Sequence, residues 1–441
     1  MIKLRRIKFI LVFFCLMLIV AAGAEIVNKP DKVSDSFSKH AVAVLDEVWT
    51  NIKNSHFDRD FEKNYRNSIY NKYLPEIKQA GSDTQLAGIL NRMVKEFGQS
   101  HIQVLPPIHD LEIMVLSAAE QNVQPVPLNT LDVPADVGII PCITEGKLCI
   151  LRTVTGSPAD AAGIRAGDFI ISVNGLKLDP AVKSYIPWDT LTSFMLAGMP
   201  ESKVTIVTVN SNGVQKEYKL TRKSNGFNWF QFGAIPRTYG AFYAEMLPGN
   251  IGYIHLTAFF PEQITSFIKT VTGKLKDARG LIIDMRNNVG GVIILPQWLA
   301  GWSCPEVIKM GKLQLKETTL TPSSYPQSQC FKGPVVILIN EATASAAEIF
   351  AASMQDSKKA VLFGSTTSGK CLPSQFLRLP SGFRLQTIFG DYERENGKHI
   401  EHLGVSPDVP VSLKLSDLRN NIDTVREAAA KYLEHKLAEK K

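Results

Sequence analysis

The pattern of apolar and polar positions divides the chain into three parts. Between residues 31 and 97 apolar residues recur at helical spacing, which predicts a small helical bundle. Residues 136–222 contain short β-rich runs separated by turn signals, with one helix expected at about 189–197. From about residue 236, apolar strands alternate with helices. We therefore expect an α/β multidomain protein with a helical bundle, a β-rich domain and an α/β domain.

The third part has the clearest alternation. Fully apolar runs of four to six residues indicate buried strands, and the segments between them have helical patterns. This order favours a parallel sheet covered on both faces. The strands are expected near 251–256, 281–284, 335–339 and 360–363, the helices near 261–276, 293–302 and 346–355, and an irregular polar stretch at 303–332. A packing helix with Leu418, Ile422, Val425 and Ala429 at helical spacing is expected to close the chain.

The first 24 residues have the pattern of a signal peptide. Four basic residues precede the apolar run Phe9 to Val20, and Ala22-Gly23-Ala24 follows as a cleavage signal. An uncleaved membrane anchor is the alternative, but the run is short for a membrane span. We therefore expect an exported protein, periplasmic or extracellular, with no stable membrane span after cleavage. The expected division is 1–24 signal peptide, 25–115 helical domain, 130–223 β-rich domain, 236–412 α/β domain and 413–441 C-terminal helix.

Composition and charge narrow the function classes. Apolar residues make up 45% of the 441 residues, which is typical of globular domains. The net charge of +7 includes four charges in the leader and forms no long basic block, so we expect no nucleic-acid partner. Export would permit disulfides. Cys304 and Cys330 are one candidate pair, Cys142 and Cys149 face each other across an expected hairpin, and Cys371 is the expected free thiol.

Three polar elements follow the predicted buried strands. Ser345 lies between a strand and a helix, where it either caps the helix or acts as an exposed nucleophile. Lys370 follows the next strand and is either a solvated loop lysine or a general base with a pKa lowered by burial. The turn 284–291 ends in paired glycines that let the backbone approach a reacting group. Gly364 to Lys370 also nearly matches a phosphate-binding loop, but Cys371 and Pro373 contradict that interpretation.

In combination these elements resemble the C-terminal processing, or tail-specific, serine peptidase family. Asp284 to Gly291 resembles the motif D-L-R-N-N-P-G-G, and Ala342 to Glu348 resembles S-A-S-A-S-E. Gly364 to Lys370 resembles G-x-x-T-x-G-K, and Gly404 to Asp408 resembles G-V-x-P-D. The resemblance implies a crotonase-like α/β catalytic domain and no metal or organic cofactor.

The second part resembles a PDZ domain of the bacterial peptidase type, through Gly156 to Ile164 and Val173-Asn174-Gly175. Such domains bind a peptide C-terminus as an added strand. The resemblance implies that Gly138, Ile139 and Ile140 hold the peptide carboxylate, and that the partners are proteins or peptides with free C-termini.

The resemblance also assigns catalytic roles. Ser345 would be the nucleophile of an acyl-enzyme mechanism, with Lys370 as its general base. Backbone N–H groups of Ala346 and of Gly290 or Gly291 would form the oxyanion hole. The family's lysine-orienting Gln falls on Ser374 here, so Gln375 would need a bulge to take that role.

Two alternatives stay open. Gly98-Gln99-Ser100-His101 resembles the Ser-His pair of tricorn-type peptidases, in which His101 would be the base and Glu401 its supporting carboxylate. The departures around Lys370 also allow a catalytically inactive peptide-binding protein of the same fold. Helices at both chain ends are candidates for homodimer contacts.

Overall fold

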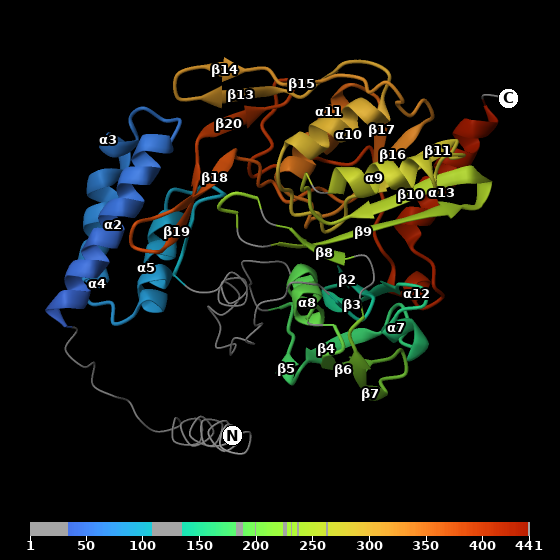
Figure 1. Ribbon diagram of the computed structural model, residues 1–441, viewed down its shortest axis with the longest axis horizontal. Helices are drawn as coiled ribbons and strands as arrows, with labels where there is room; N and C mark the ends of the chain where they lie inside the picture. Colours follow the sequence, from blue (N-terminus) through green and yellow to red (C-terminus); the bar gives the residue numbers. More distant parts are fainter. Residues whose placement is uncertain are drawn as a thin grey trace, which may run out of the picture.

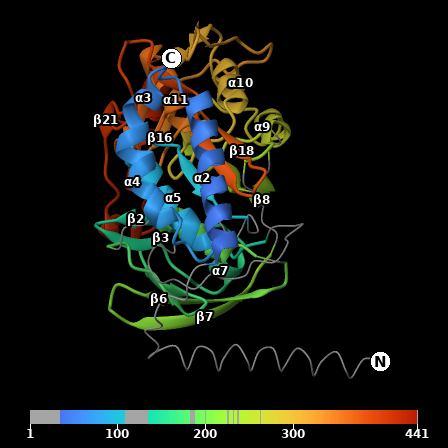
Figure 2. The ribbon, with the colours of Figure 1, turned by 90° about the vertical axis from the view of Figure 1, so that its left-hand side faces the viewer.

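The computed structural model shows the three expected parts (Figure 1). The helical part and the PDZ-like part lie against different sides of the large α/β part, as the two views show (Figure 2). The leader 1–24 lies outside the described residues, which are 34–107, 135–181, 188–198, 200–223, 227–230, 232–235, 238–261 and 263–439. No helix in these ranges is long and apolar enough to cross a membrane.

The N-terminal part is a helical layer on a small sheet. Serine hydroxyls cap its two main helices, with Ser34 accepting from the Phe37 amide and Ser82 from the Gln85 amide. Its sheet has the order β1-β19-β18, and two of these strands come from the C-terminal third of the chain. The helices are α2 (Asp35–Ser55), α3 (Phe61–Tyr65), a π-helix (Arg66–Tyr70), α4 (Asn71–Ile77) and α5 (Asp83–Lys95), and the strands β1 (Gln103–Leu105), β18 (Ser374–Arg378) and β19 (Arg384–Ile388).

The hairpin β18–β19 therefore completes the core of the helical part and does not join the sheet of the large α/β part. Phe383, Leu385 and Ile388 are fully buried in the same cluster as Trp49 of α2. The sequence places the first domain at 25–115, but the structure adds this distant hairpin because the helices need an apolar partner that their own segment lacks.

The PDZ-like part is an antiparallel sheet with the order β2-β3-β4-β6-β7 and one covering helix. Strand β2 lies at the edge, beside α8 (Figure 1). The elements are β2 (Ile139–Thr144), β3 (Lys147–Thr153), α7 (Pro158–Ala161), β4 (Phe169–Val173), β5 (Leu176–Lys177), α8 (Trp188–Leu196), β6 (Lys203–Val209) and β7 (Gln215–Thr221).

The large α/β part is built on a seven-stranded sheet with the order β21-β17-β16-β11-β10-β9-β8. Strands β10, β11, β16 and β17 are parallel, as predicted. Alternate residues face opposite cores: Leu281 and Ile283 pack with α9–α11, and Ile282 packs with α13. The strands are β8 (Phe227–Phe230), β9 (Thr238–Leu247), β10 (Ile251–Leu256), β11 (Gly280–Asp284), β16 (Val335–Ile339), β17 (Ala360–Gly364) and β21 (Val409–Pro410), and the helices α9 (Gln263–Thr272), α10 (Ile294–Ser303), α11 (Ala346–Asp356) and α13 (Thr424–Ala438).

Three details differ from the sequence-based expectations. The stretch 303–332 contains four short strands, because it pairs with itself and with β20 (Gly390–Glu393). The closing segment forms two helices, α12 (Leu415–Leu418) and α13, and Ile422 is exposed in the break between them. All five cysteines outside the leader are free thiols, including Cys304 and Cys330. The four strands are β12 (Ile308–Lys309), β13 (Lys312–Leu315), β14 (Thr319–Leu320) and β15 (Ser323–Ser324).

Candidate active site

Ser345 is the N-cap residue immediately before α11 and has an unusual backbone. Its φ of 59° and ψ of −126° lie outside the extended region that a helix-capping serine normally adopts. A strained residue between a buried strand and a helix marks a functional turn more often than a simple cap. The side chain is half-buried, and the helix N-terminus beneath it presents amide donors.

Glu348 holds this turn against the loop that carries Lys370. The fully buried carboxylate accepts hydrogen bonds from the amides of Ser345 (3.0 Å), Gly369 (2.8 Å) and Lys370 (3.0 Å), and from the Thr367 hydroxyl (2.5 Å). Burial raises its pKa although these donors oppose the shift. Sequence reasoning did not assign this role to Glu348. The Ser-x-x-Glu spacing of a capping box was the available signal.

The glycine turn after β11 lies against Ser345. A Cβ atom on Gly290 would lie 2.7 Å from the Ser345 Cβ, and its φ of +89° excludes most side chains. The Gly290 amide donates to Asn288 Oδ1 over 2.9 Å, while the Asn288 carbonyl accepts from Ala344 over 2.9 Å. Because Gly290 N–H is already engaged, Gly291 is the better of the two predicted oxyanion donors.

Lys370 lies beside Ser345 through its backbone but not in a dry site. Its carbonyl accepts the Ser345 amide over 2.8 Å, and its side chain is exposed. This exposure differs from the burial expected for Lys370. Gln375 is likewise exposed on β18, and the Ser374 hydroxyl accepts from Gln386 over 2.9 Å, so no bulge brings Gln375 inward.

The alternative residues His101 and Glu401 form a connected hydrogen-bonded group. The Ser100 hydroxyl lies 2.7 Å from His101 Nδ1 and donates to Glu401 Oε2 over 3.0 Å. The Glu401 carboxylate also accepts from the amides of Ser100 (2.8 Å) and Cys371 (2.9 Å). The Ser100 hydroxyl donates its proton to Glu401, so its contact with His101 is assigned as a hydrogen bond from Nδ1–H. The other ring nitrogen, Nε2, then carries a lone pair.

Burial, and secondly the charge of Lys370, lower the pKa of His101 to about 4. His101 is therefore neutral at pH 7, the state that a general base requires. The effect of Lys370 also shows that the two candidate bases lie near each other. Cys371 links them, since its amide donates to Glu401 and it follows Lys370 directly.

The expected peptide groove lies between β2 and α8. Gly138 has a φ of +77°, and its amide donates to Asp136 Oδ1 over 2.7 Å, so its role is to shape the turn. Ile139 and Ile140 line a pocket whose opposite wall includes Asn287 of the glycine turn. The side-chain Nδ2 of Asn287 in turn donates to the Pro141 carbonyl of β2 over 3.3 Å.

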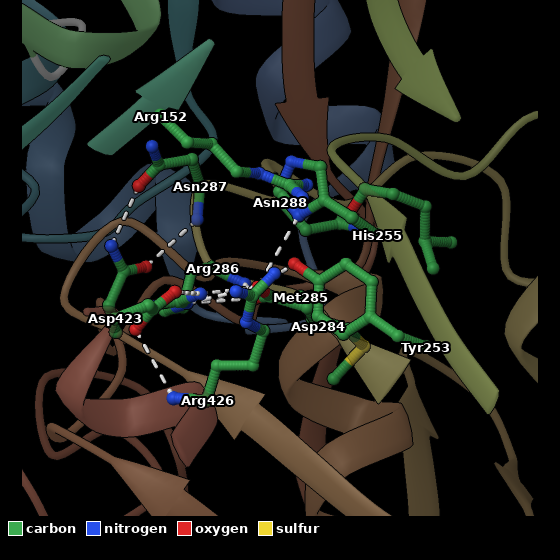
Figure 3. Close-up of polar contacts among 12 residues, drawn as sticks. Arg152, Tyr253, His255, Asp284, Met285, Arg286, Asn287, Asn288, Asp423 and Arg426 are labelled. Atoms are coloured by element: carbon green, nitrogen blue, oxygen red, sulfur yellow. Dashed lines mark hydrogen bonds and ion pairs between the residues drawn. The ribbon is translucent and has the colours of Figure 1, made fainter. Parts of the chain in front are cut away.

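A buried ion-pair network supports the glycine turn from below (Figure 3). Arg286 pairs with Asp284 at the end of β11 and with Asp423 at the start of α13, each over 2.6 Å. Tyr253 donates to the same Asp284 carboxylate over 2.6 Å. Although burial opposes the shift, the Arg286 charge and its hydrogen bonds hold the pKa of both carboxyl groups below its usual range.

Comparison with known families agrees with this geometry. Residues 250–411 match the family described as Peptidase family S41, and residues 150–210 match the PDZ domain. The chain therefore contains a peptidase family S41 domain and a PDZ domain, and its relatives are named carboxyl-terminal-processing peptidases. It is thus a serine-type peptidase in family terms, and the hypothesis of a family resemblance is confirmed.

The individual relatives are distant in sequence. The chain is 25% identical over 385 residues to carboxyl-terminal-processing peptidase 3, chloroplastic, of Arabidopsis thaliana, covering 85% of this chain and 69% of that one. It is 26% identical to the carboxy-terminal processing protease CtpA of Bacillus subtilis, covering 61% of this chain and 54% of that one. The chain thus spans between about half and about two thirds of these two relatives.

Two solved structures share its fold. The photosystem II D1 C-terminal processing protease has a TM-score of 0.51 at 20% identity and covers 89% of this chain and 98% of its own. The tricorn protease has a TM-score of 0.53 at 17% identity and covers 91% of this chain and 37% of its own.

Proposed function

We propose that this protein is an exported serine endopeptidase that cleaves protein substrates near their C-termini, with Ser345 as nucleophile. The observation that carries the proposal is the left-handed backbone of Ser345 at the start of α11, in contact with Gly290 and hydrogen-bonded to Lys370. The names of its relatives support the substrate class, and the leader pattern supports a periplasmic or extracellular location.

The general base of this proposal is His101, with Ser100 and Glu401 as positioning residues. The hydrogen-bonded order Glu401, Ser100, His101 leaves Nε2 with a lone pair and stabilises the positive charge that forms when His101 takes a proton. Lys370 remains the second candidate. Its exposed side chain lacks the burial that a neutral lysine requires.

In the proposed reaction Ser345 Oγ attacks the scissile carbonyl, and its proton passes to His101 Nε2. The tetrahedral oxyanion accepts hydrogen bonds from the amides of Ala346 and Gly291. Collapse transfers the proton to the leaving amine and leaves an acyl-enzyme on Ser345. Water, deprotonated by His101, then hydrolyses this ester and restores the hydroxyl.

The PDZ groove would hold the substrate's C-terminus beside this site. Strand β2 is an edge strand, so an extended peptide can add to it. The loop of Gly138, Ile139 and Ile140 would meet the terminal carboxylate. The contact from Asn287 to Pro141 places that groove next to the glycine turn, so one substrate can occupy both.

The deciding experiment compares single variants on one unfolded protein substrate, with circular dichroism to check folding. Ser345→Ala and His101→Asn should each lower kcat/KM at least about a thousandfold, and Glu401→Gln about tenfold or more. His435→Asn is the matched control, because that exposed histidine on α13 pairs with Glu439 and not with any member of the group. Abolished cleavage in Lys370→Ala alongside mild loss in His101→Asn would move the base to Lys370. No cleavage by the unmodified mature protein would favour a peptide-binding protein.

A further inference from the structure

A pocket lies where the PDZ groove meets the catalytic part. Residues 139–141 of β2 form one wall, Thr190 of α8 a second, and His255 of β10 and Asn287 of the glycine turn a third. Its volume of about 40 Å³ exceeds what a single water requires. Because β2 is the edge strand, a peptide added beside it would direct side chains toward this space.

Two polar side chains in the pocket wall lack hydrogen-bond partners. Within the described residues, Thr190 Oγ1 and both ring nitrogens of His255 are buried without a hydrogen bond, with only 9% and 2% of the two residues exposed. By contrast, the Ser193 hydroxyl in the same wall donates to the Asp189 carbonyl over 3.0 Å. Unsatisfied buried polar atoms are rare in folded proteins, so their concentration here indicates a missing polar group.

The surrounding charges decide which kind of group fits. Asp284 Oδ2 lies 3.7 Å from His255 Nδ1, beyond hydrogen-bond distance, and Tyr253 and Arg286 already bind that carboxylate (Figure 3). Burial lowers the pKa of His255, with Arg152 and Arg286 adding to the effect and Asp284 opposing it. A neutral imidazole and a hydroxyl together offer donors and acceptors but no net charge.

We propose that this pocket binds a neutral hydrogen-bonding side chain, a hydroxyl or a carboxamide, from one of the last residues of the peptide in the PDZ groove. The inference rests on the proposed function, since it requires the groove to take a substrate C-terminus. Thr190 and His255 are then specificity residues that belong to different parts of the chain. A substrate tail with Ser, Thr, Asn or Gln at that position would satisfy both, whereas an apolar tail would leave both unpaired.

Peptide binding to the full-length Ser345→Ala variant tests this without turnover. Fluorescent peptides carry Thr or the isosteric Val at each of the last three positions, and amidated copies control for the carboxylate. At one position the Thr peptide should bind about tenfold or more tightly than the Val peptide. Thr190→Val and His255→Leu, each added to that background, should reduce this preference to less than about threefold.

The matched control is Thr192→Val in the same background. Thr192 is fully buried on the same helix, but its hydroxyl donates to the Trp188 carbonyl rather than entering the pocket, so the preference should persist. Peptides that bind through their carboxylate but show no preference for Thr over Val would overturn this inference alone. The pocket would then hold a water instead of a substrate side chain. Absent or carboxylate-independent binding would overturn the proposed role of the groove as well.

Discussion

The amide of Ser345 donates to the carbonyl of Lys370 over 2.8 Å. This bond joins the turn before α11 to the loop after β17, and so it joins two motifs that lie twenty-five residues apart in the chain. Glu348 reinforces the junction through the amides of both residues. The catalytic geometry therefore depends on backbone contacts between loops as much as on the reacting side chains.

Replacing Glu348 should disturb both loops together. In Glu348→Gln, the carboxylate that accepts four hydrogen bonds becomes a carboxamide. Its NH₂ group is itself a donor and cannot accept, so some of the four donors lose their partner. We expect a loss of about 2 kcal/mol in the free energy of unfolding and a fall in kcat of tenfold or more. Urea unfolding and steady-state kinetics measure these effects. Glu341→Gln, an exposed carboxylate in the same turn, should change neither quantity appreciably.

The close approach of Gly290 to Ser345 predicts that activity is sensitive to any side chain at position 290. In Gly290→Ala the new methyl would meet Ser345 Cβ at 2.7 Å, so the nucleophile must move, and kcat/KM should fall about a hundredfold or more. Gly397→Ala is matched to it, with a φ of +82° and nothing within 4 Å of the added Cβ. That control should lose stability from backbone strain but keep its activity. Equal kinetic effects in the two variants would contradict the role of Gly290.

The pKa of His101 predicts an unusual pH profile. Because the base must be neutral, the acidic limb of kcat/KM should lie near pH 4 instead of near 6.5. Removing the nearby charge in Lys370→Met should shift that limb upward, because Lys370 contributes to lowering the pKa. A catalytic lysine would instead give an inactive variant.

The lowered pKa of His101 also predicts how the free energy of unfolding changes with pH. The unfolded chain binds a proton on this histidine below pH 6.5, and the folded chain binds one only below about pH 4. Its contribution to stability is therefore complete above pH 6.5 and is lost as the pH falls from 6.5 to about 4. Urea unfolding at several pH values across this window measures the effect. The free energy of unfolding should fall less in His101→Asn than in the unmodified protein.

The buried charges beneath the glycine turn should be costly to break. Asp423→Ala leaves the Arg286 guanidinium with half of its partners in a fully buried site, which should lower the free energy of unfolding by about 3–5 kcal/mol. The exposed pair of Arg59 and Glu317 provides the control, since Glu317→Ala should cost less than about 1 kcal/mol. Chemical unfolding of the two variants measures both effects.

Cys142 and Cys149 are directly opposed on β2 and β3, with sulfur atoms 3.3 Å apart. We expect oxidised glutathione to convert this pair to a disulfide by thiol–disulfide exchange, with the loss of two hydrogens per chain in intact mass. The short loop that this bond closes should add about 2 kcal/mol to stability. Cys142→Ser should abolish the mass change, whereas Cys371→Ser should leave it intact. Retention of both thiols under oxidising conditions would contradict this expectation.

Much of the architecture followed from the sequence by itself. Apolar runs such as Val335 to Ile339 are typical of strands buried on both faces, and their alternation with helices predicted the parallel order that the sheet shows. Local patterns also located Ser345 between a strand and α11. These features depend on neighbours in the chain, which is why periodicity and motifs are sufficient to predict them.

Tertiary structure alone decided which candidate residues share an environment. Ser100 and Glu401 lie 301 residues apart, and no local pattern could show that one hydroxyl joins Glu401 to His101. Burial is likewise a property of the assembled chain, so the exposure of Lys370 and the burial of His255 could not be read from the sequence. The hairpin β18–β19 joined the helical part for the same reason: apolar surface is buried by whichever segment the fold brings near it.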